Sequence, residues 1–311
     1  MKPYLTVLND RFISISGPDA IKFLQGQCSC DLLSLSEHAF SFGTLNTPKG
    51  RMYALFKVIK TEQGLLLSLE QSLLESTLEK LRKYAVFFKC ELKETNDYRA
   101  YGLIDFPGSS PVLSLSRQTK AFILTLSETQ QLHEIWLDST QTEQDLINLL
   151  PQQQTETLEL VHAPQDLWYA KETLCGIPAL YANTQEEFIL QNLNLQQLGA
   201  VSFKKGCYTG QEIIARMKFL GKVKKQCFLL KSDARCIAEP KQVILDAQGN
   251  KCGTLVRLHW SEQTGSVSLA ILNIEDALNY GALYLEGHPD IPFSIFEADY
   301  SEFLNQAANK A

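Results

Sequence analysis

The last third of the chain places the tightest limit on the fold. Between residues 226 and 296 it consists of short segments in which apolar and polar residues alternate, namely CFLLK, VILDAQGNKCGTLVRLHW, SVSLAIL, LYLEG and PFSIFE. Glycine or proline stands between them, which is the pattern of half-buried strands joined by turns. Many short strands of this kind are typical of a small antiparallel barrel or sandwich. We therefore predict a separate C-terminal β-barrel domain over residues 220–311.

The preceding part of the chain mixes strands with amphipathic helices. Within residues 52–94, MYALFKVIK and GLLLSL are predicted strands, SLLESTLEKLRKYAV is a helix with leucines at helical spacing, and FFKCELKE is a third strand. Residues 100–150 repeat the order of strands followed by a helix. The prediction for residues 1–219 is therefore an α+β body of two interlocked units.

Length and charge exclude several classes of protein. A chain of 311 residues is long enough for two or three domains. Its formal net charge of -6 argues against a general nucleic-acid binder, which is usually basic. The opening MKPYLTVLNDRFISI lacks the apolar region of a signal peptide, and no apolar run approaches the roughly 20 residues that cross a bilayer. We expect a cytoplasmic protein that does not contact a membrane.

The cysteines do not form a recognisable metal or disulfide pattern. None of the 8 cysteines belongs to a CxxC pair, and cytosolic thiols stay reduced. Cys28 and Cys30 form a CxC motif, but no nearby histidine or second cysteine pair completes a metal site. We therefore expect both to be ordinary core or surface residues, and we expect no intrinsic metal. Phosphate-loop, dinucleotide, HExxH and GxSxG motifs are also missing from the sequence.

A basic segment stands out in this acidic chain. Residues 204–225, KKGCYTGQEIIARMKFLGKVKK, contain seven lysines or arginines and a single acidic residue, Glu212. The stretch Thr209-Gly210-Gln211-Glu212 fits a capping box, so we predict that Thr209 caps a helix that ends at Gly221.

This helix would place Cys207 just before its positive end. The helix dipole and a lysine ammonium, from Lys204 or Lys205, both favour a thiolate, which makes Cys207 a candidate reactive thiol. An inert cysteine and a solvated cationic face are the ordinary explanations for the same residues, and both stay open.

The nine residues KKGCYTGQE closely resemble the KGCYTGQE signature of the YgfZ family of folate-binding proteins, which are relatives of the glycine-cleavage aminomethyltransferase, or T protein. ISGPDAIKFLQGQ, LNTPKGRMYALFKV and the block that begins with GIPALYANTQEEF resemble further family segments in the same order. The resemblance implies a T-protein-like fold, with a discontinuous α+β body of ferredoxin-like units and a C-terminal antiparallel β-barrel. It also implies that tetrahydrofolate binds in a central channel, and that the protein helps to make, repair or maintain iron–sulfur enzymes, including those that thiolate tRNA.

The resemblance also assigns candidate folate-binding residues. Trp168 precedes the TLCGIP block, where the family has an aromatic residue that lines the folate site, and a flat indole suits stacking on a ring. Tyr169 beside it is a weaker candidate. Leu174 replaces the family's glutamate in this block, and Glu172 lies nearby at another register. Arg11, where some relatives have an aromatic residue, is expected to stack on a ring or pair with folate carboxylates.

The remaining candidates lie in the second family block and in the signature: Asn46, Lys49, Arg51, Lys205 and Tyr208. Folate carries a glutamate tail that is often extended to several residues. The cations of residues 204–225 are expected to hold this tail, because charges beyond roughly 8–10 Å are screened and a local cluster acts even in an acidic protein.

Three functions stay open. The leading hypothesis is a tetrahydrofolate-binding accessory protein with iron–sulfur enzymes as its clients. The second is a folate-dependent aminomethyltransferase, although residues 43–58 contain no carboxylate to act on the folate nitrogen, which counts against one-carbon transfer. The third is a tRNA-binding module that uses residues 204–225 on phosphates. Net charge and the lack of an RNA-binding motif argue against direct nucleic-acid binding.

Overall fold

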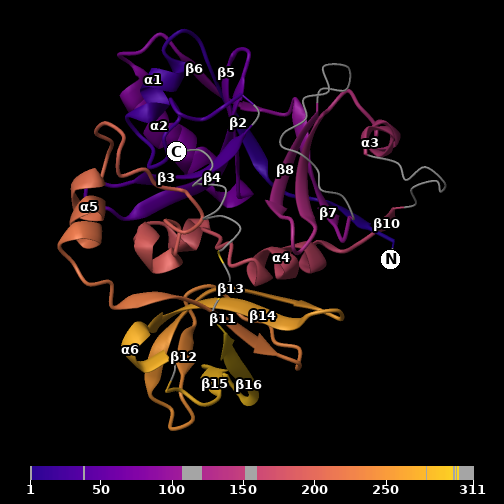
Figure 1. Cartoon of the computed structure of the whole chain (residues 1–311), viewed down its shortest axis with the longest axis vertical. Helices are drawn as coiled ribbons and strands as arrows, with labels where there is room; N and C mark the ends of the chain where they lie inside the picture. The colour runs from indigo at the N-terminus through magenta and orange to yellow at the C-terminus, as the bar shows by residue number, and fades with distance from the viewer. Residues whose placement is uncertain are drawn as a thin grey trace. The chain divides into compact units, whose positions relative to one another are not determined.

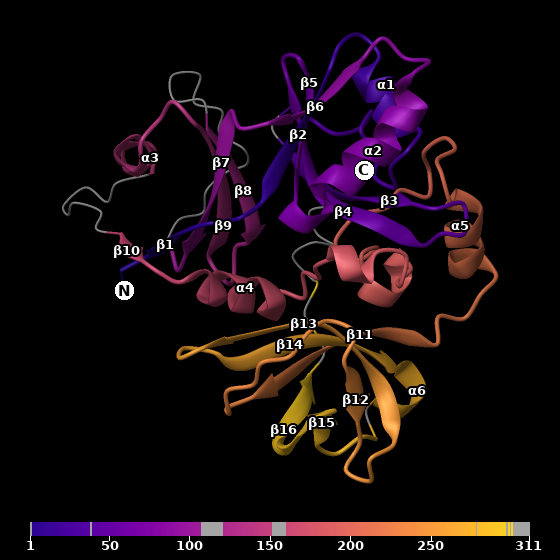
Figure 2. The same ribbon diagram turned by 180° about the vertical axis from the view of Figure 1, so that it is seen from behind.

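The computed structural model describes residues 2–37, 39–106, 121–150, 160–277, 279–296, 298 and 300. Within these residues the fold is α+β, with two five-stranded sheets and a closed barrel of six antiparallel strands (Figures 1 and 2). This confirms the predicted fold class. The chain forms two compact units, and both are discontinuous in sequence: residues 1–25, 32–41 and 56–168 in the first, and residues 26–31, 42–55 and 169–311 in the second.

One sheet lies entirely in the first unit. Its strands, in spatial order, are β10 (Val161–His162), β1 (Tyr4–Val7), β7 (Tyr98–Ile104), β9 (Leu132–Asp138) and β8 (Ala121–Ser127). The pair β10–β1 is parallel, and the other neighbours are antiparallel. Helix α3 (Glu143–Leu149) begins at a capping box formed by Thr142 and Asp145. Its Leu146 is buried against apolar residues of these strands, such as Leu103 and Ile135.

The other sheet has the order β3 (Phe40–Asn46), β4 (Met52–Thr61), β5 (Gly64–Leu69), β2 (Arg11–Ser16) and β6 (Glu91–Thr95). Strands β3 and β4 run from one compact unit into the other. The helical segments that connect the strands of this sheet are α1 (Ala20–Gln25), which follows β2, and η1 (Gln71–Leu73) and α2 (Leu74–Ala85), which follow β5. Leucines at positions 74, 78 and 81 are buried, as their spacing predicts. The strand expected from residue 87 begins only at Glu91, and Phe87 is exposed.

The second unit contains the barrel. Its strands are β11 (Lys225–Ser232), β14 (Gly265–Asn273), β13 (Lys251–Ser261), β12 (Val243–Leu245), β15 (Leu283–Leu285) and β16 (His288–Phe296), labelled in Figure 1. Alternate residues of these strands fill its core, among them Phe228, Leu255 and Phe293. The predicted barrel is therefore confirmed, and the predicted domain boundary at residue 220 stays a prediction.

The remaining helical segments are α4 (Gln165–Leu174), which crosses from the first unit into the second, and η2 (Ala182–Thr184), η3 (Leu190–Leu193), α5 (Gln211–Phe219) and α6 (Ile274–Ala277) in the second. In the part of the chain that the structure describes, no helix has the length and apolar character needed to span a bilayer.

Candidate functional site

The signature loop, which we define as residues 204–211, is anchored by a buried lysine. Lys205 is only 9% exposed, and its Nζ donates hydrogen bonds to the carbonyl oxygens of Cys28, at 2.9 Å, and Cys30, at 2.7 Å. The same ammonium lies 5.1 Å from the centroid of the buried Tyr208 ring. An ammonium removed from water requires such acceptors. Lys205 therefore ties the signature loop to residues 26–31 of the same unit.

Cys207 faces solvent from this anchored loop. All eight cysteines lie in the described residues, and Cys207 is the one that is exposed, whereas Cys90 is partly buried and the others are buried. The predicted reactive thiol is thus accessible to reagents and partners. The lysine next but one in sequence, Lys205, points inward to backbone carbonyls.

The predicted cap at Thr209 was wrong. Helix α5 begins at Gln211, its N-cap is Gly210 at φ +83°, and no side chain caps it. Thr209 Oγ1 instead donates to Gln27 Oε1 at 3.4 Å. A Cβ on Gly210 would lie 2.6 Å from the carbonyl oxygen of Thr47. The close approach of these two backbones places the N-cap at Gly210, one residue after the predicted cap. The helix ends at Phe219, near the expected Gly221.

Two predicted site residues hold buried oxygens that have no hydrogen-bond partner within the described structure. Asn46 is 1% exposed; its Nδ2 donates to Thr44 Oγ1 at 2.9 Å, but its Oδ1 has no partner. The hydroxyl oxygen of Tyr208 is likewise buried and unpaired. Burial raises the pKa of Tyr208 to about 12, so this hydroxyl is protonated at neutral pH and can donate. Unpaired buried oxygens are uncommon in folded proteins, and these two differ from the other unpaired oxygens of the described residues in belonging to the predicted site.

Residues 28–30 connect these side chains to one another. Thr44 Oγ1 donates to Ser29 Oγ at 2.9 Å, and Ser29 Oγ donates to the carbonyl oxygen of Ala200 at 2.5 Å. Ser29 lies between the two cysteines whose carbonyls hold Lys205. The fold therefore gathers Asn46, Lys205 and Tyr208 around residues 28–30.

A pocket with a volume of about 510 Å³ lies beside the loop between β3 and β4. Its lining includes the predicted residues Lys49 and Arg51 together with Glu186 and Glu187. The guanidinium of Arg51 donates to the carbonyl oxygen of Glu187, and Lys241 pairs with the Glu187 carboxylate at 2.8 Å. Cations and carboxylates thus share this pocket.

The two other candidates, Trp168 and Arg11, belong to the first unit. Trp168 is 1% exposed, and a Cβ on Gly102 would lie 2.3 Å from its Cε3 atom, so the indole packs directly on the backbone of β7. Arg11 is partly exposed on β2 and forms an ion pair with Glu94. A folate contact at either residue stays a prediction.

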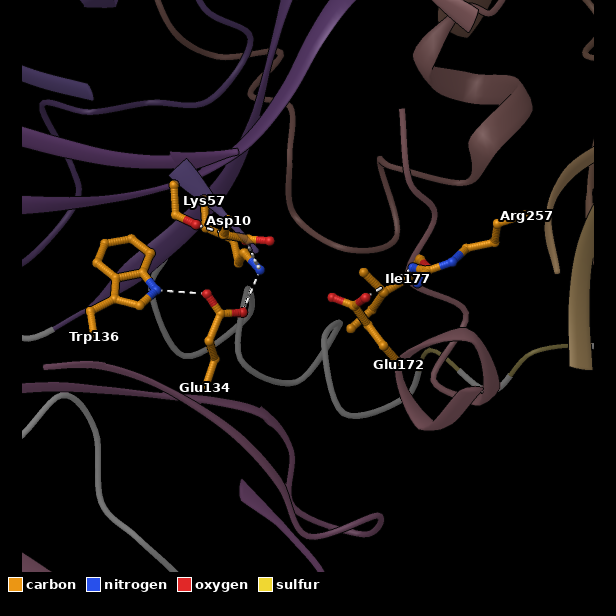
Figure 3. Close-up of polar contacts among 8 residues, drawn as sticks. Asp10, Lys57, Glu134, Trp136, Glu172, Ile177 and Arg257 are labelled. Atoms are coloured by element: carbon orange, nitrogen blue, oxygen red, sulfur yellow. Dashed lines mark hydrogen bonds and ion pairs between the residues drawn. The ribbon is translucent and has the colours of Figure 1, made fainter. Parts of the chain in front are cut away.

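Sequence reasoning missed a buried charged cluster in the first unit. Lys57 on β4 pairs with Glu134 on β9 and, at 3.4 Å, with Asp10, while Trp136 Nε1 donates to Glu134 at 2.6 Å (Figure 3). Burial raises the pKa of Glu134 to about 7, against the opposing charge of Lys57. Glu134 lies outside residues 43–58, the segment in which a catalytic carboxylate would be expected. A lysine and a glutamate inside otherwise apolar strands were the available signal.

A second buried pair lies in the second unit. Arg257 on β13 is 2% exposed, and its Nη1 donates to Glu172 at 2.9 Å and to the carbonyl oxygen of Ile177 at 3.0 Å (Figure 3). Burial, assisted by the charge of Arg257, lowers the pKa of His259 to about 2. Glu172 lies two residues before Leu174, the position where the family has a glutamate, and it joins α4 to the barrel.

Comparisons with known proteins agree with the geometry of the fold. The "tRNA-modifying protein YgfZ" of Colwellia psychrerythraea is 31% identical over 265 residues, which is 84% of this chain and 82% of that protein. The protein of the same name from Aliivibrio fischeri is 30% identical over 286 residues, 87% of this chain and 86% of that protein. An uncharacterized protein of Haemophilus influenzae is 32% identical over 82% of this chain and 84% of its own length.

A solved structure shares the fold at low sequence identity. The glycine cleavage system aminomethyltransferase T from Bartonella henselae superposes with a TM-score of 0.70 and 16% identity, over 95% of this chain and 85% of that chain. No family model matches the sequence. Because the YgfZ relatives are 30–31% identical to this chain over most of both sequences, the chain belongs to the YgfZ family, and its fold resembles that of aminomethyltransferase T.

Proposed function

We propose that this protein binds tetrahydrofolate and, in that form, supports iron–sulfur enzymes, including those that thiolate tRNA. Membership of a family whose relatives are named tRNA-modifying proteins supports the tRNA part of this proposal. The fold of an aminomethyltransferase is consistent with a folate ligand. The observation that carries the folate proposal is the pair of unpaired buried oxygens on Asn46 and Tyr208.

The chemistry of folate suits these two oxygens. The pterin ring of tetrahydrofolate has amine and ring N–H donors together with a carbonyl acceptor. Asn46 Oδ1 can only accept, whereas the protonated Tyr208 hydroxyl can donate. A buried polar group without a partner loses about 1–3 kcal/mol of hydration that a bound ring would restore. We assign Asn46 and Tyr208 to the ring.

The glutamate tail requires cations that remain accessible. Lys49 and Arg51 border the pocket beside the β3–β4 loop, and both are exposed. Lys204, Arg216 and Lys218 add exposed positive charge along the signature loop and α5. Lys205 is buried, and its hydrogen bonds to the carbonyl oxygens of Cys28 and Cys30 support a role in holding the loop. When bound, tetrahydrofolate supplies nitrogens that carry one-carbon units, and Cys207 supplies an exposed thiol.

Calorimetric titration with tetrahydrofolate and its triglutamate form tests the proposal. Tyr208→Phe and Asn46→Leu should each weaken binding of both ligands, by roughly threefold to tenfold if one hydrogen bond is lost. Thr77→Val is the matched control, because Thr77 Oγ1 on α2 is also buried and unpaired but lies outside the predicted site. Lys49→Ala should reduce the gain from the longer tail. Unchanged affinity in both Tyr208→Phe and Asn46→Leu would refute the assignment.

One further assay separates this proposal from aminomethyl transfer. Residues 43–58 contain no carboxylate, and Asp10 and Glu134 already accept hydrogen bonds from Ser68 and Trp136. We therefore expect no turnover with an aminomethylated lipoyl carrier protein and tetrahydrofolate. Sustained transfer would make the aminomethyltransferase the better assignment, even if folate binds as proposed.

A further inference from the structure

Cys28 and Cys30 form a close pair of buried thiols. Their side chains are 0% and 1% exposed, and their Sγ atoms lie 3.6 Å apart, within hydrogen-bonding distance for sulfur. The intervening Ser29 is held by its own hydrogen bonds to Thr44 and Ala200. The chain between the two cysteines is therefore held in place at Ser29.

A buried cation accompanies the pair. Lys205 Nζ lies 2.9 Å and 2.7 Å from the carbonyl oxygens of Cys28 and Cys30, although it is more than 170 residues away in sequence. Burial by itself raises the pKa of Cys28, but its hydrogen bond with Cys30 and the charge of Lys205 outweigh burial and leave the pKa below its ordinary value. The pKa of Cys30 is raised well above its ordinary value by its hydrogen bond to Cys28 and by burial.

This arrangement separates the two sulfurs chemically. The thiolate therefore forms more readily at Cys28 than at Cys30, as in pairs where one sulfur attacks and its neighbour completes a disulfide. Cys227 shows what burial does without a cation, since burial alone raises the pKa of that thiol. Within the described residues, no group of three His, Cys, Asp or Glu side chains is placed to hold a metal. The pair therefore favours sulfur redox chemistry.

We propose that Cys28 and Cys30 are a redox pair that a small hydroperoxide oxidises to an intramolecular disulfide. The Cys28 thiolate attacks the O–O bond and becomes a sulfenic acid, and the leaving oxygen takes a proton. Cys30 sulfur then attacks Cys28 sulfur, the S–S bond forms, and the hydroxyl of the sulfenic acid leaves as water with the proton of Cys30. The two thiols together lose two electrons and two protons. An organic hydroperoxide becomes an alcohol and one water, and hydrogen peroxide becomes two waters.

The geometry also determines which oxidants react. The sulfurs must approach from 3.6 Å to a bond length of about 2 Å, which needs only a local movement of two residues. Both sulfurs are shielded from solvent, so a small hydroperoxide can reach them where a bulky disulfide cannot. The exposed Cys207, in contrast, is open to both kinds of oxidant.

The test uses the full chain with Cys207→Ser, which removes the exposed thiol. Hydrogen peroxide should remove two hydrogen atoms from the mass of the tryptic peptide that contains Cys28 and Cys30, and a dithiol reductant should restore them. Glutathione disulfide should leave this peptide unchanged. With Cys30→Ser, a sulfenic-acid probe should label Cys28, and with Cys28→Ser it should not label Cys30.

The role of the cation is tested separately. Lys205→Met should slow disulfide formation by about tenfold, because the ammonium favours the thiolate. Cys227→Ser is the matched control, since Cys227 is also buried and burial alone shifts its pKa, and it should leave the rate unchanged. If Lys205→Met does not fold, the sulfenic-acid trapping in Cys30→Ser still decides the question. Two intact thiols at positions 28 and 30 after peroxide treatment would overturn the proposal, whether or not folate binds.

Discussion

Neighbouring side chains in the signature loop have opposite surroundings. Lys204 is exposed, whereas Lys205 is buried on the carbonyls of Cys28 and Cys30. Cys207 is exposed, and Tyr208 is buried with an unpaired hydroxyl. The loop therefore presents one thiol to solvent while Lys205 and Thr209 hold it against residues 26–31. This division of roles between adjacent residues has direct consequences for the reactivity of the thiol.

Cys207 should be alkylated by iodoacetamide at neutral pH before any other cysteine, because the other seven are buried or partly buried. Mass spectrometry of tryptic peptides at successive times measures the order. Cys207→Ala should fold and bind folate, yet fail to support iron–sulfur enzymes in cells that lack the native protein. Cys90→Ala is the control and should restore them. Equal labelling of Cys207 and the buried thiols would contradict the exposure seen here.

At the scale of elements, single strands and turns combine groups of opposite character. His133 and Glu134 are consecutive residues of β9, so their side chains point to opposite faces of the sheet. His133 lies beside Phe106 and contacts Thr125 at 3.0 Å, whereas Glu134 meets Lys57 and Trp136. Burial lowers the pKa of His133 to about 4 and raises that of Glu134 to about 7.

These two residues should give opposite pH dependences of stability. Folding raises the pKa of Glu134 to about 7, so its contribution to stability is complete below its ordinary pKa of 4.5 and is lost as pH rises towards 7. His133 stays neutral when folded, so its contribution is complete above its ordinary pKa of 6.5 and is lost as pH falls towards 4. Urea unfolding at pH 5 and pH 7 measures both effects.

The change in unfolding free energy that Glu134→Gln causes, relative to the unmodified protein, should be more favourable at pH 7 than at pH 5. The change that His133→Gln causes should show the reverse pH dependence. Each variant thus serves as the control for the other. The same direction in both variants would show that the buried state of at least one of these groups differs from the structure.

The turn into α5 depends on one glycine. Gly210→Ala introduces a side chain at φ +83° and 2.6 Å from the Thr47 carbonyl oxygen, so unfolding free energy should fall by at least about 1 kcal/mol. Gly206→Ala is a matched control in the same loop, because a Cβ there meets no atom within 4 Å. Urea denaturation compares the two. A Gly210→Ala variant as stable as Gly206→Ala would contradict the close approach of these backbones.

On the scale of the whole molecule, the two compact units use buried ion pairs in different ways. In the first unit, Lys57 joins strands of its two sheets through Glu134. In the second, Arg257 joins the barrel to the end of α4 through Glu172. Loss of one partner from a buried pair removes a compensating charge from the other.

Arg257→Met should therefore lower the unfolding free energy by about 3–5 kcal/mol, because it removes the guanidinium that pairs with the buried Glu172 carboxylate. The double variant Glu172→Gln with Arg257→Met should recover part of this loss. Lys222→Ala, which breaks the exposed pair with Glu275, is the control and should have no measurable effect. Urea unfolding tests all three. A single Arg257→Met variant with unaltered stability would show that the pair contributes nothing to the fold.

Features that depend on local pattern were predictable from the sequence. Alternating residues 226–296 predicted the barrel, the leucines of α2 predicted its buried face, and the KGCYTGQE signature identified the family. These succeed because strand and helix periodicities, and a family signature, are written in consecutive residues. The Thr209 capping box failed for the opposite reason, since a backbone contact between Gly210 and the distant Thr47 decided where the helix begins.

Only the tertiary structure decided which distant groups meet. Lys205 reaches Cys28 and Cys30 across more than 170 residues, and Lys57 reaches Glu134 across 77. In a single sequence, each of these residues looks like a surface charge or an ordinary core thiol. Their burial and pairing arise from strand order and from the interleaving of the chain between two compact units. Because electrostatic and hydrogen-bond energies depend on distance and burial, the chemistry of these groups is determined only once the chain has folded.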